Sequence, residues 1–317
     1  MLVSLITSSV AMGIVFLYGC LGETITERVG NLNLGIPGIM CLGALGGVVG
    51  VETTYAIFST PGWLPLMFNA ILFSCLFASF GGLIYSFLTV SLQANQNVTG
   101  LVLTTFGVGL MQFIGSNIKT ENLSGASRIM KSFLNVGDKL GWFGKIFLNY
   151  GFLIFFAIIL AVSASIFLRK TRVGLFLRAV GESPKTADAQ GINITKYKYT
   201  FILIGSAIAG LGGMYYVMDY SGGTTFTDAP IEAFGWLAVA LVIFSVWKPT
   251  IGIAGAIAFG LLYILPMYIK IDPIQLKLFD MFPYITTVIV LILTSIFGGR
   301  SIQPPGSLGV NYYREDR

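Results

Sequence analysis

Histidine is absent from this chain of 317 residues, and charged residues make up only 10% of it. Without an imidazole, the chain has neither a histidine metal site nor the commonest side-chain proton shuttle. Soluble domains usually contain roughly 25% charged residues, so water is not the solvent for most of this surface. Hydrophobic residues make up 55% of the sequence, and we therefore expect a membrane protein.

Cysteine is also scarce, and Cys20, Cys41 and Cys75 all lie in apolar stretches without a pairing or ligand pattern. We interpret them as small buried hydrophobic residues and predict no disulfide, metal or cofactor site. The phosphate-binding motif G-x-x-x-x-G-K-[ST] is missing too. Its nearest imitation, GSAIAGLGG at 205–213, has no lysine and lies in an apolar stretch. We therefore expect neither ATP hydrolysis nor any other enzymatic activity from this chain.

Long uncharged stretches dominate what is present. About 20 helical residues cross a hydrocarbon core of roughly 30 Å. These stretches predict one all-α domain over residues 1–317, a polytopic membrane bundle of about nine helices. Because the first residues lack the basic start and cleavage pattern of a signal peptide, we expect the first helix to be retained. The predicted spans are about 3–22, 32–51, 64–92, 98–118, 146–168, 199–218, 233–247, 249–269 and 281–298.

Lysine and arginine gather in one connection, residues 169–198, whereas residues 219–232 carry neither. Basic residues are enriched in cytoplasmic loops. The pattern therefore predicts a cell-membrane protein with residues 169–198 and the C-terminus in the cytoplasm and the N-terminus outside. The net charge of +5 then follows from loop orientation, and nucleic-acid binding is not expected.

Small residues recur at four-residue spacing in several spans, as in Gly43/Gly47, Gly205/Ala209/Gly213, Ser206/Gly210 and Gly252/Ala256/Gly260. Such spacing lets the backbones of membrane helices approach closely. We interpret these residues as packing positions within one subunit, with a contact between two subunits as the alternative.

A short helix outside the membrane is predicted within residues 169–198. Ser183 is a suitable N-cap, Pro184 suits the first helical position, and Gly191 suits the left-handed site after the last turn. The helical body, Pro184–Gln190, is about two turns long and too short to be stable alone. Docking to a partner protein would explain this helix. The alternative is a solvated connection that only carries positive charge.

Two motifs carry a resemblance to a known family. The run from Gly174 to Ile192, GLFLRAVGESPKTADAQGI, resembles the coupling-loop signature of ABC importer permeases of the branched-chain amino acid, ribose and nucleoside group. The run from Glu27 to Met40, ERVGNLNLGIPGIM, is similar to the second-helix motif of the nucleoside and simple-sugar branch. The implied architecture is the type II importer fold without its usual first helix. Many relatives have an acidic residue where this chain has Pro37, so no carboxylate role is transferred there.

The resemblance implies a permease subunit for nucleosides. A simple sugar of the ribose or galactose type is the main alternative, and a branched-chain amino acid, a stand-alone channel or an ion-coupled carrier are remoter ones. It also implies three partners in a bacterial membrane: a cytoplasmic ABC ATPase that uses ATP and Mg²⁺, a second homologous permease in a heterodimer, and an external substrate-binding lipoprotein. Coupling to the ATPase is assigned to Glu182, Ser183, Pro184, Lys185, Thr186, Ala187, Asp188, Ala189, Gln190 and Gly191.

Neutral hydrogen-bonding side chains near the span ends are the candidate solute contacts, with capping of helix ends as the alternative. No acidic or basic residue falls in the middle of a predicted span, so an ion pathway is not expected. Segment 32–51 holds six glycines and Pro37, which favours an irregular helix beside the pathway. A tightly packed, kinked helix is the alternative. The candidate pathway residues are Asn31, Asn33, Gln93, Asn95, Asn97, Thr99 and Gln112.

Overall fold

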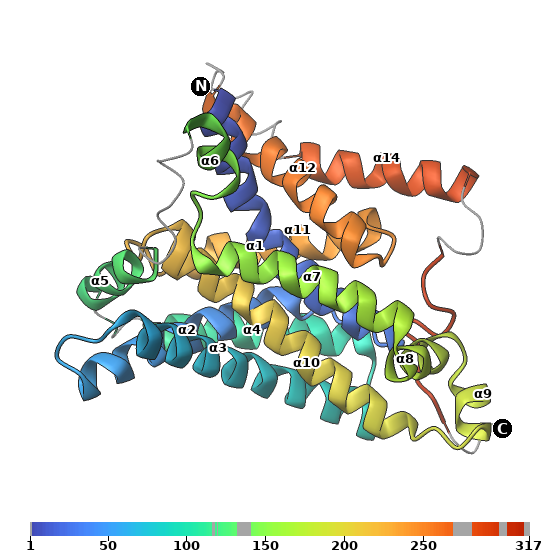
Figure 1. Cartoon of the computed structure of the whole chain (residues 1–317). Coiled ribbons are helices and arrows are strands. Elements are labelled where there is room, and N and C mark those ends of the chain that lie inside the picture. Colours follow the sequence, from blue (N-terminus) through green and yellow to red (C-terminus); the bar gives the residue numbers. More distant parts are fainter. Residues whose placement is uncertain are drawn as a thin grey trace.

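The computed structural model describes residues 2–115, 118, 120–131, 141–268, 281–297 and 303–313. These residues form helices joined by turns, with no β-strand among them (Figure 1). The predicted all-α bundle is confirmed. The long helices are α1 (Leu2–Arg28), α2 (Ile36–Ile57), α3 (Trp63–Ser86), α4 (Gln96–Gly115), α7 (Phe152–Lys170), α10 (Ile194–Tyr215), α11 (Asp228–Phe244), α12 (Pro249–Tyr268) and α14 (Phe282–Phe297). The shorter segments are α5 (Thr120–Lys131), α6 (Gly141–Phe147), α8 (Arg172–Glu182), α9 (Pro184–Ala189) and the π-helical η1 (Phe87–Ser91) and η4 (Tyr216–Tyr220).

Each predicted span coincides with one long helix. Within the described ranges, seven helices are both long and apolar enough to cross a membrane. The other two long helices are shorter: α11 has 17 residues and α14 has 16 residues. The unusually long window 64–92 is explained by η1, which continues α3 into one helical stretch, Trp63–Ser91.

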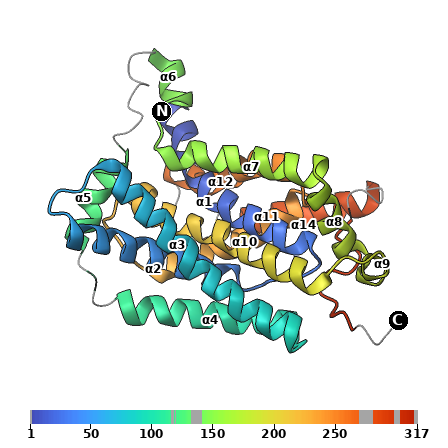
Figure 2. The ribbon, with the colours of Figure 1, turned by 60° about the horizontal axis from the view of Figure 1, so that its bottom comes forward.

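The long helices run between two ends of the molecule, which we name after short helices that lie there (Figures 1 and 2). The α9 end holds α8, α9, the turns that follow α1, α3 and α11, and residues 303–313. The α5 end holds α5, α6, η4 and the start of α1. At the α9 end, the Arg28 guanidinium donates to the Trp247 carbonyl at 3.1 and 3.2 Å. At the α5 end, the Tyr215 hydroxyl donates to the Ala11 carbonyl at 2.8 Å.

The middle of the bundle is built around α1, α2 and α10. Helix α10 packs against α1 on one side and against α2 and α3 on another. Large aromatic side chains fill this region, and their polar atoms find partners there, as buried tyrosines usually require. The Tyr18 hydroxyl donates to the Leu153 carbonyl at 2.7 Å, and the Tyr85 hydroxyl donates to the Leu32 carbonyl at 2.6 Å.

The small residues at four-residue spacing lie where helices approach most closely. A Cβ atom on Gly43 of α2 would lie 2.2 Å from the Cα atom of Gly210 on α10. A Cβ atom on Gly205 would lie 2.5 Å from the carbonyl oxygen of Gly22 on α1, and one on Gly260 of α12 would lie 2.2 Å from that of Ser9. These contacts join helices of one chain, so the interpretation as packing within one subunit is confirmed for them.

Segment 32–51 differs from its prediction. The chain forms a regular helix from Ile36, because Pro37 falls in the first turn, where its missing N–H has no helical acceptor to lose. Gly38 permits contact with α4, since a Cβ atom there would lie 2.4 Å from the Leu103 carbonyl oxygen. The expectation of an irregular helix was wrong, and the alternative of a tightly packed helix fits better. The irregular backbone lies in the preceding turn, residues 29–35.

Candidate functional site

Local chemistry defines both ends of α9. The Ser183 hydroxyl accepts a hydrogen bond from the Thr186 N–H at 3.4 Å, and Pro184 occupies the first turn. After the helix, Gly191 adopts a φ of 79°, in the left-handed region that favours glycine. The Ile192 N–H then donates to the Ala187 carbonyl at 3.1 Å. The predicted short helix and both of its caps are confirmed.

Helix α8 attaches α9 firmly to the membrane helices. A Cβ atom on Gly174 would lie 2.2 Å from the Phe167 carbonyl oxygen of α7. At the other end of α8, a Cβ atom on Gly181 would lie 2.2 Å from the Arg28 carbonyl oxygen of α1. Residues 171–191, which we name the α8–α9 bracket, are therefore closely packed against α1 and α7 through α8.

The two faces of α9 differ in chemistry. Pro184 and Ala187 are buried against the rest of the chain, and Ala187 is only 3% exposed. The outward face is small and polar, and it offers no apolar stripe to lipid. Such a surface suits docking to another protein in water. The outward residues of the helix and its C-terminal turn are Lys185, Thr186, Ala189 and Gln190.

Two buried carboxylates lie near the same end of the bundle. Glu23 and Glu27 occupy neighbouring positions on one face of α1 and are 0% and 2% exposed. One oxygen of Glu23 accepts the Asn33 N–H at 2.9 Å. Glu27 accepts a hydrogen bond from the indole N–H of Trp247. The carboxylates thereby join α1 to the turn before α2 and to the turn after α11.

The sequence pattern did not indicate this buried cluster. The first span was predicted to end at residue 22, which left Glu23 and Glu27 in a polar connection. The structure continues α1 to Arg28 and buries both carboxyl groups, so the predicted end of this span at residue 22 was wrong. The four-residue spacing directly after an apolar run was the available signal.

Trp247 sits in a strained turn between α11 and α12. Val246 and Trp247 have φ values of 54° and 53°, and a left-handed conformation costs most residues roughly 1–2 kcal/mol each. Hydrogen bonds from α1 hold this turn, because Arg28 donates to the Trp247 carbonyl while Glu27 accepts from its indole. The C-terminal end of α1 therefore stabilises the turn between α11 and α12.

Replacing Trp247 with phenylalanine is expected to lower the free energy of unfolding by about 1–3 kcal/mol, because Glu27 loses its donor while buried. The matched control is Trp236→Phe, since the Trp236 indole lies partly exposed on α11 without a hydrogen bond to another described residue. Unfolding of the purified protein in detergent compares the two variants. Equal losses in both variants would contradict the assigned role of the indole.

Most of the predicted pathway residues lie at the α9 end. Asn31 and Asn33 are buried in the turn before α2. Asn95 and Asn97 are exposed at the start of α4, where the Asn95 side chain accepts the Val98 N–H at 3.1 Å. The Thr99 hydroxyl donates to the Asn95 carbonyl at 2.8 Å. Capping of a helix end therefore accounts for Asn95.

The two predicted glutamines lie at opposite ends of the bundle. Gln93, in the turn before α4, donates to the Tyr312 carbonyl at 3.3 Å. Gln112, near the end of α4, donates to the Asp228 carboxylate at the α5 end at 2.9 Å. The candidate set is therefore not one continuous lining, and its role in solute contact stays a prediction.

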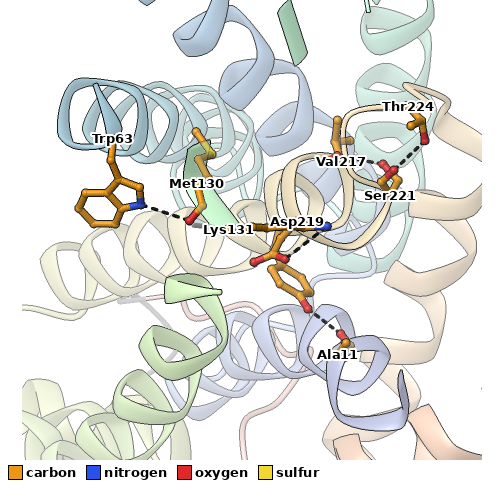
Figure 3. Close-up of polar contacts among 9 residues, drawn as sticks. Ala11, Trp63, Met130, Lys131, Val217, Asp219, Ser221 and Thr224 are labelled. Atoms are coloured by element: carbon orange, nitrogen blue, oxygen red, sulfur yellow. Dashed lines mark hydrogen bonds and ion pairs between the residues drawn. The ribbon is translucent and has the colours of Figure 1, made fainter. Parts of the chain in front are cut away.

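The α5 end carries a second polar cluster, shown in Figure 3. The Lys131 ammonium of α5 lies 4.0 Å from the Asp219 carboxylate of η4. The Trp63 indole donates to the Met130 carbonyl at 3.2 Å, and the Ser221 hydroxyl donates to the Val217 carbonyl at 2.9 Å. The bond to Met130 fastens α5 to the start of α3, the ion pair joins α5 to η4, and the Ser221 bond closes the end of η4.

Each end of the bundle has a cavity. At the α5 end, about 390 Å³ is lined by residues that include Ser8, Lys131, Tyr150 and Asp219. Burial raises the pKa of the Tyr150 hydroxyl to about 12, so this hydroxyl is neutral near pH 7. At the α9 end, a larger cavity of about 710 Å³ lies between η1, α9 and the start of α10.

Comparison with known proteins shows one consistent group. The family model described as "Branched-chain amino acid transport system / permease component" matches residues 5–291. The chain is 32% identical to the nucleoside ABC transporter permease protein NupC of Lactococcus lactis, over 94% of this chain and 93% of that protein. It is 30% identical to the guanosine ABC transporter permease protein NupQ of Bacillus subtilis, over 94% and 92%. It is also 31% identical to the "Putative glucose ABC transporter permease protein TsgC13" of Haloferax volcanii, over 90% of each chain. No solved structure matched.

Proposed function

Because the chain belongs to the family of permease components of branched-chain amino acid type transport systems, we propose that it is the membrane-spanning subunit of an ABC importer for nucleosides. As a transport subunit, the chain would itself hydrolyse no ATP. In the proposed cycle, an external lipoprotein delivers the solute, and ATP binding closes two ATPase subunits. Docking of α9 in a groove of the ATPase then tilts the permease pair between outward-open and inward-open states.

The α8–α9 bracket is the observation that carries this proposal. It combines close packing against α1 and α7 with an outward face of small and polar residues. A force applied to that face would reach α1 and α7 through these close contacts. Two relatives that cover more than nine-tenths of the chain, NupC and NupQ, are described as nucleoside and guanosine permeases, and this description supports the choice of solute.

The charge distribution supports a cytoplasmic α9 end. Basic residues gather there, whereas the α5 end carries Asp219 in η4 and Asp228 and Glu232 in α11, beside Arg128 and Lys131 of α5. Cytoplasmic loops are enriched in lysine and arginine, so α9 would face the ATPase and the α5 end would face the lipoprotein. ATP and Mg²⁺ would be bound by the partner ATPase. The basic residues of the α9 end are Arg28, Arg169, Lys170, Arg172, Arg178, Lys185, Lys196, Lys198 and Lys248.

A second homologous permease is the third proposed partner. One side of α4 exposes large apolar side chains with no other described helix covering them. Lipid or a second permease suits this surface, and a functional importer of this kind requires two permease subunits. The exposed residues are Val98, Leu101, Val102 and Phe106.

Loss of the gene is expected to lower uptake of labelled nucleosides by at least tenfold in its host, with ribose and glucose uptake unchanged. Complementation with the intact gene should restore it. The matched measurement is equilibrium binding of the same nucleosides and sugars to the partner lipoprotein. If neither class of solute depended on the gene, the proposed function would be wrong.

A simple sugar is the second candidate, because the Haloferax relative of similar identity is described as a glucose permease. The same uptake experiment separates the two. Loss of ribose, galactose or glucose uptake with unchanged nucleoside uptake would assign the chain to sugars and leave the proposed coupling of α9 intact.

A further inference from the structure

Residues 303–313 lie across the α9 end and contact helices that are far away in sequence. The Ser307 N–H and hydroxyl both donate to the Gly181 carbonyl, at 2.9 and 2.6 Å. The Gly306 N–H donates to the Glu182 carboxylate at 3.2 Å. The Gly309 N–H donates to the Gly30 carbonyl at 3.3 Å. The first half of this segment is therefore tied to the α8–α9 bracket and to the turn between α1 and α2.

The second half of the segment is tied to the turn between α3 and α4. The Asn311 side-chain amide donates to the Gln93 and Ala94 carbonyls, at 2.6 and 3.2 Å. Its oxygen accepts the Gln96 side-chain amide at 3.0 Å. Gln93 has a φ of 55°, and the bonds from Asn311 hold its backbone in this left-handed conformation.

Tyr312 completes the connection to α9. Its hydroxyl donates to the Asp188 carboxylate at 2.8 Å. On the other side of the segment, the Gln96 side chain accepts the Leu32 N–H at 2.8 Å. A series of polar contacts thus runs from α9 through Tyr312, Asn311 and Gln96 to the turn that precedes α2.

This connection spans a region without continuous packing. The cavity of about 710 Å³ is lined by Asp188 of α9, Gln93 of the α3–α4 turn and Tyr312 of the segment. A displacement of α9 therefore cannot pass to the α3–α4 turn here through a packed core. In the sequence, α8 connects α9 to α7, and a short turn connects α9 to α10. The helices α1–α4 are not sequence neighbours of α9.

We propose that residues 303–313 form a strap that transmits displacement of α9 to the α1–α2 and α3–α4 turns, with Asn311 and Tyr312 as its positioning residues. This inference rests on the proposed function, because it assumes that an ATPase displaces α9. Its content is that a second route exists beside the packing of the bracket on α1 and α7 and the covalent link to α10: the strap reaches the α1–α2 and α3–α4 turns directly.

The test uses the complete transporter, with its ATPase and second permease, reconstituted in lipid vesicles. Solute uptake and ATP hydrolysis are measured in the same vesicles. Tyr312→Phe, which removes only the hydroxyl, is expected to lower uptake per ATP about threefold to tenfold, and Asn311→Leu at least tenfold. The matched control is Tyr313→Phe, because Tyr313 is 44% exposed, and it should leave the ratio unchanged.

Substitutions at Asp188 separate coupling from simple stability. Asp188→Leu removes the acceptor and should match Tyr312→Phe. When Asp188→Leu is already present, adding Tyr312→Phe should lower uptake per ATP no further, because both substitutions remove the same hydrogen bond. Unchanged uptake per ATP in both Tyr312→Phe and Asn311→Leu, or an equal fall in Tyr313→Phe, would overturn the strap.

A second measurement does not depend on the solute. Binding of a non-hydrolysable ATP analogue to the complex should change amide hydrogen exchange in the Gln93–Gln96 turn, and Tyr312→Phe should reduce that change. If wild-type vesicles imported neither nucleosides nor sugars, the proposed function would fail, and the exchange result alone would decide the strap. An equal change in wild type and Tyr312→Phe would overturn it.

Discussion

Ala189→Arg is expected to abolish ATP-driven uptake while leaving the membrane bundle folded. Ala189 lies on the outward face of α9, where docking to an ATPase groove would leave little room for a long cation. A lost interface anchor typically costs about 3 kcal/mol, which weakens association roughly 100-fold. Co-purification of the ATPase with the permease, together with vesicle uptake, measures both consequences.

Ala187 supplies the matched control for this substitution. It lies two residues earlier in the same helix, but it is buried against the bundle, so Ala187→Arg should detach α9 and lower the stability of the permease itself. In a Gln190→Cys variant, the new thiol should react with a membrane-impermeant reagent only from the cytoplasmic side. Normal uptake by Ala189→Arg, or labelling of residue 190 from outside, would contradict the proposed coupling face.

Gly43→Ala is expected to prevent correct assembly of α2 and α10. The new methyl group would lie 2.2 Å from the Gly210 Cα and carbonyl oxygen, and backbone atoms cannot move away as a flexible side chain can. Overpacking costs about 1–3 kcal/mol even where side chains relax, so a larger loss is expected here. The yield of folded protein after detergent extraction, and its unfolding temperature, measure the effect.

Gly109→Ala is the control, because its expected change in stability has the opposite sign. A Cβ atom on Gly109 of α4 would have no other atom within 4 Å, so the change adds no steric conflict. Alanine is a better helix former than glycine by up to about 1 kcal/mol, and Gly109→Ala should equal or slightly exceed wild type in stability. Similar behaviour of the two variants would show that close packing at Gly43 does not limit stability.

Predictions based on local chemistry matched the structure well. The caps of α9 depend on Ser183, Pro184 and Gly191, which act within a few residues of one another. The long helices were predictable because uncharged runs of sufficient length have few other solutions in a bilayer. Family resemblance supplied the coupling role, which local chemistry alone left open between docking and a solvated connection.

Features that depend on distant partners could not be predicted. Burial of Glu27 requires the indole of Trp247, which lies 220 positions away in the chain. The glycines and Pro37 of segment 32–51 suggested an irregular helix, since the contact that Gly38 permits with α4 becomes visible only in the folded bundle. Contacts of residues 303–313 were likewise not indicated, since polar residues after a final helix carry no periodic pattern.

The position of the strap also has a consequence for biosynthesis. Ribosomes release a chain from its N-terminus onward, so Asn311 and Tyr312 emerge after every membrane helix described above. A nascent chain stopped after α14 would hold all these helices and an intact α9. The Asp188 carboxylate would, however, lack the hydrogen bond from the Tyr312 hydroxyl. Contact between Tyr312 and Asp188 therefore forms only when translation of the bundle is complete, and an unfinished permease would present its α9 without this brace.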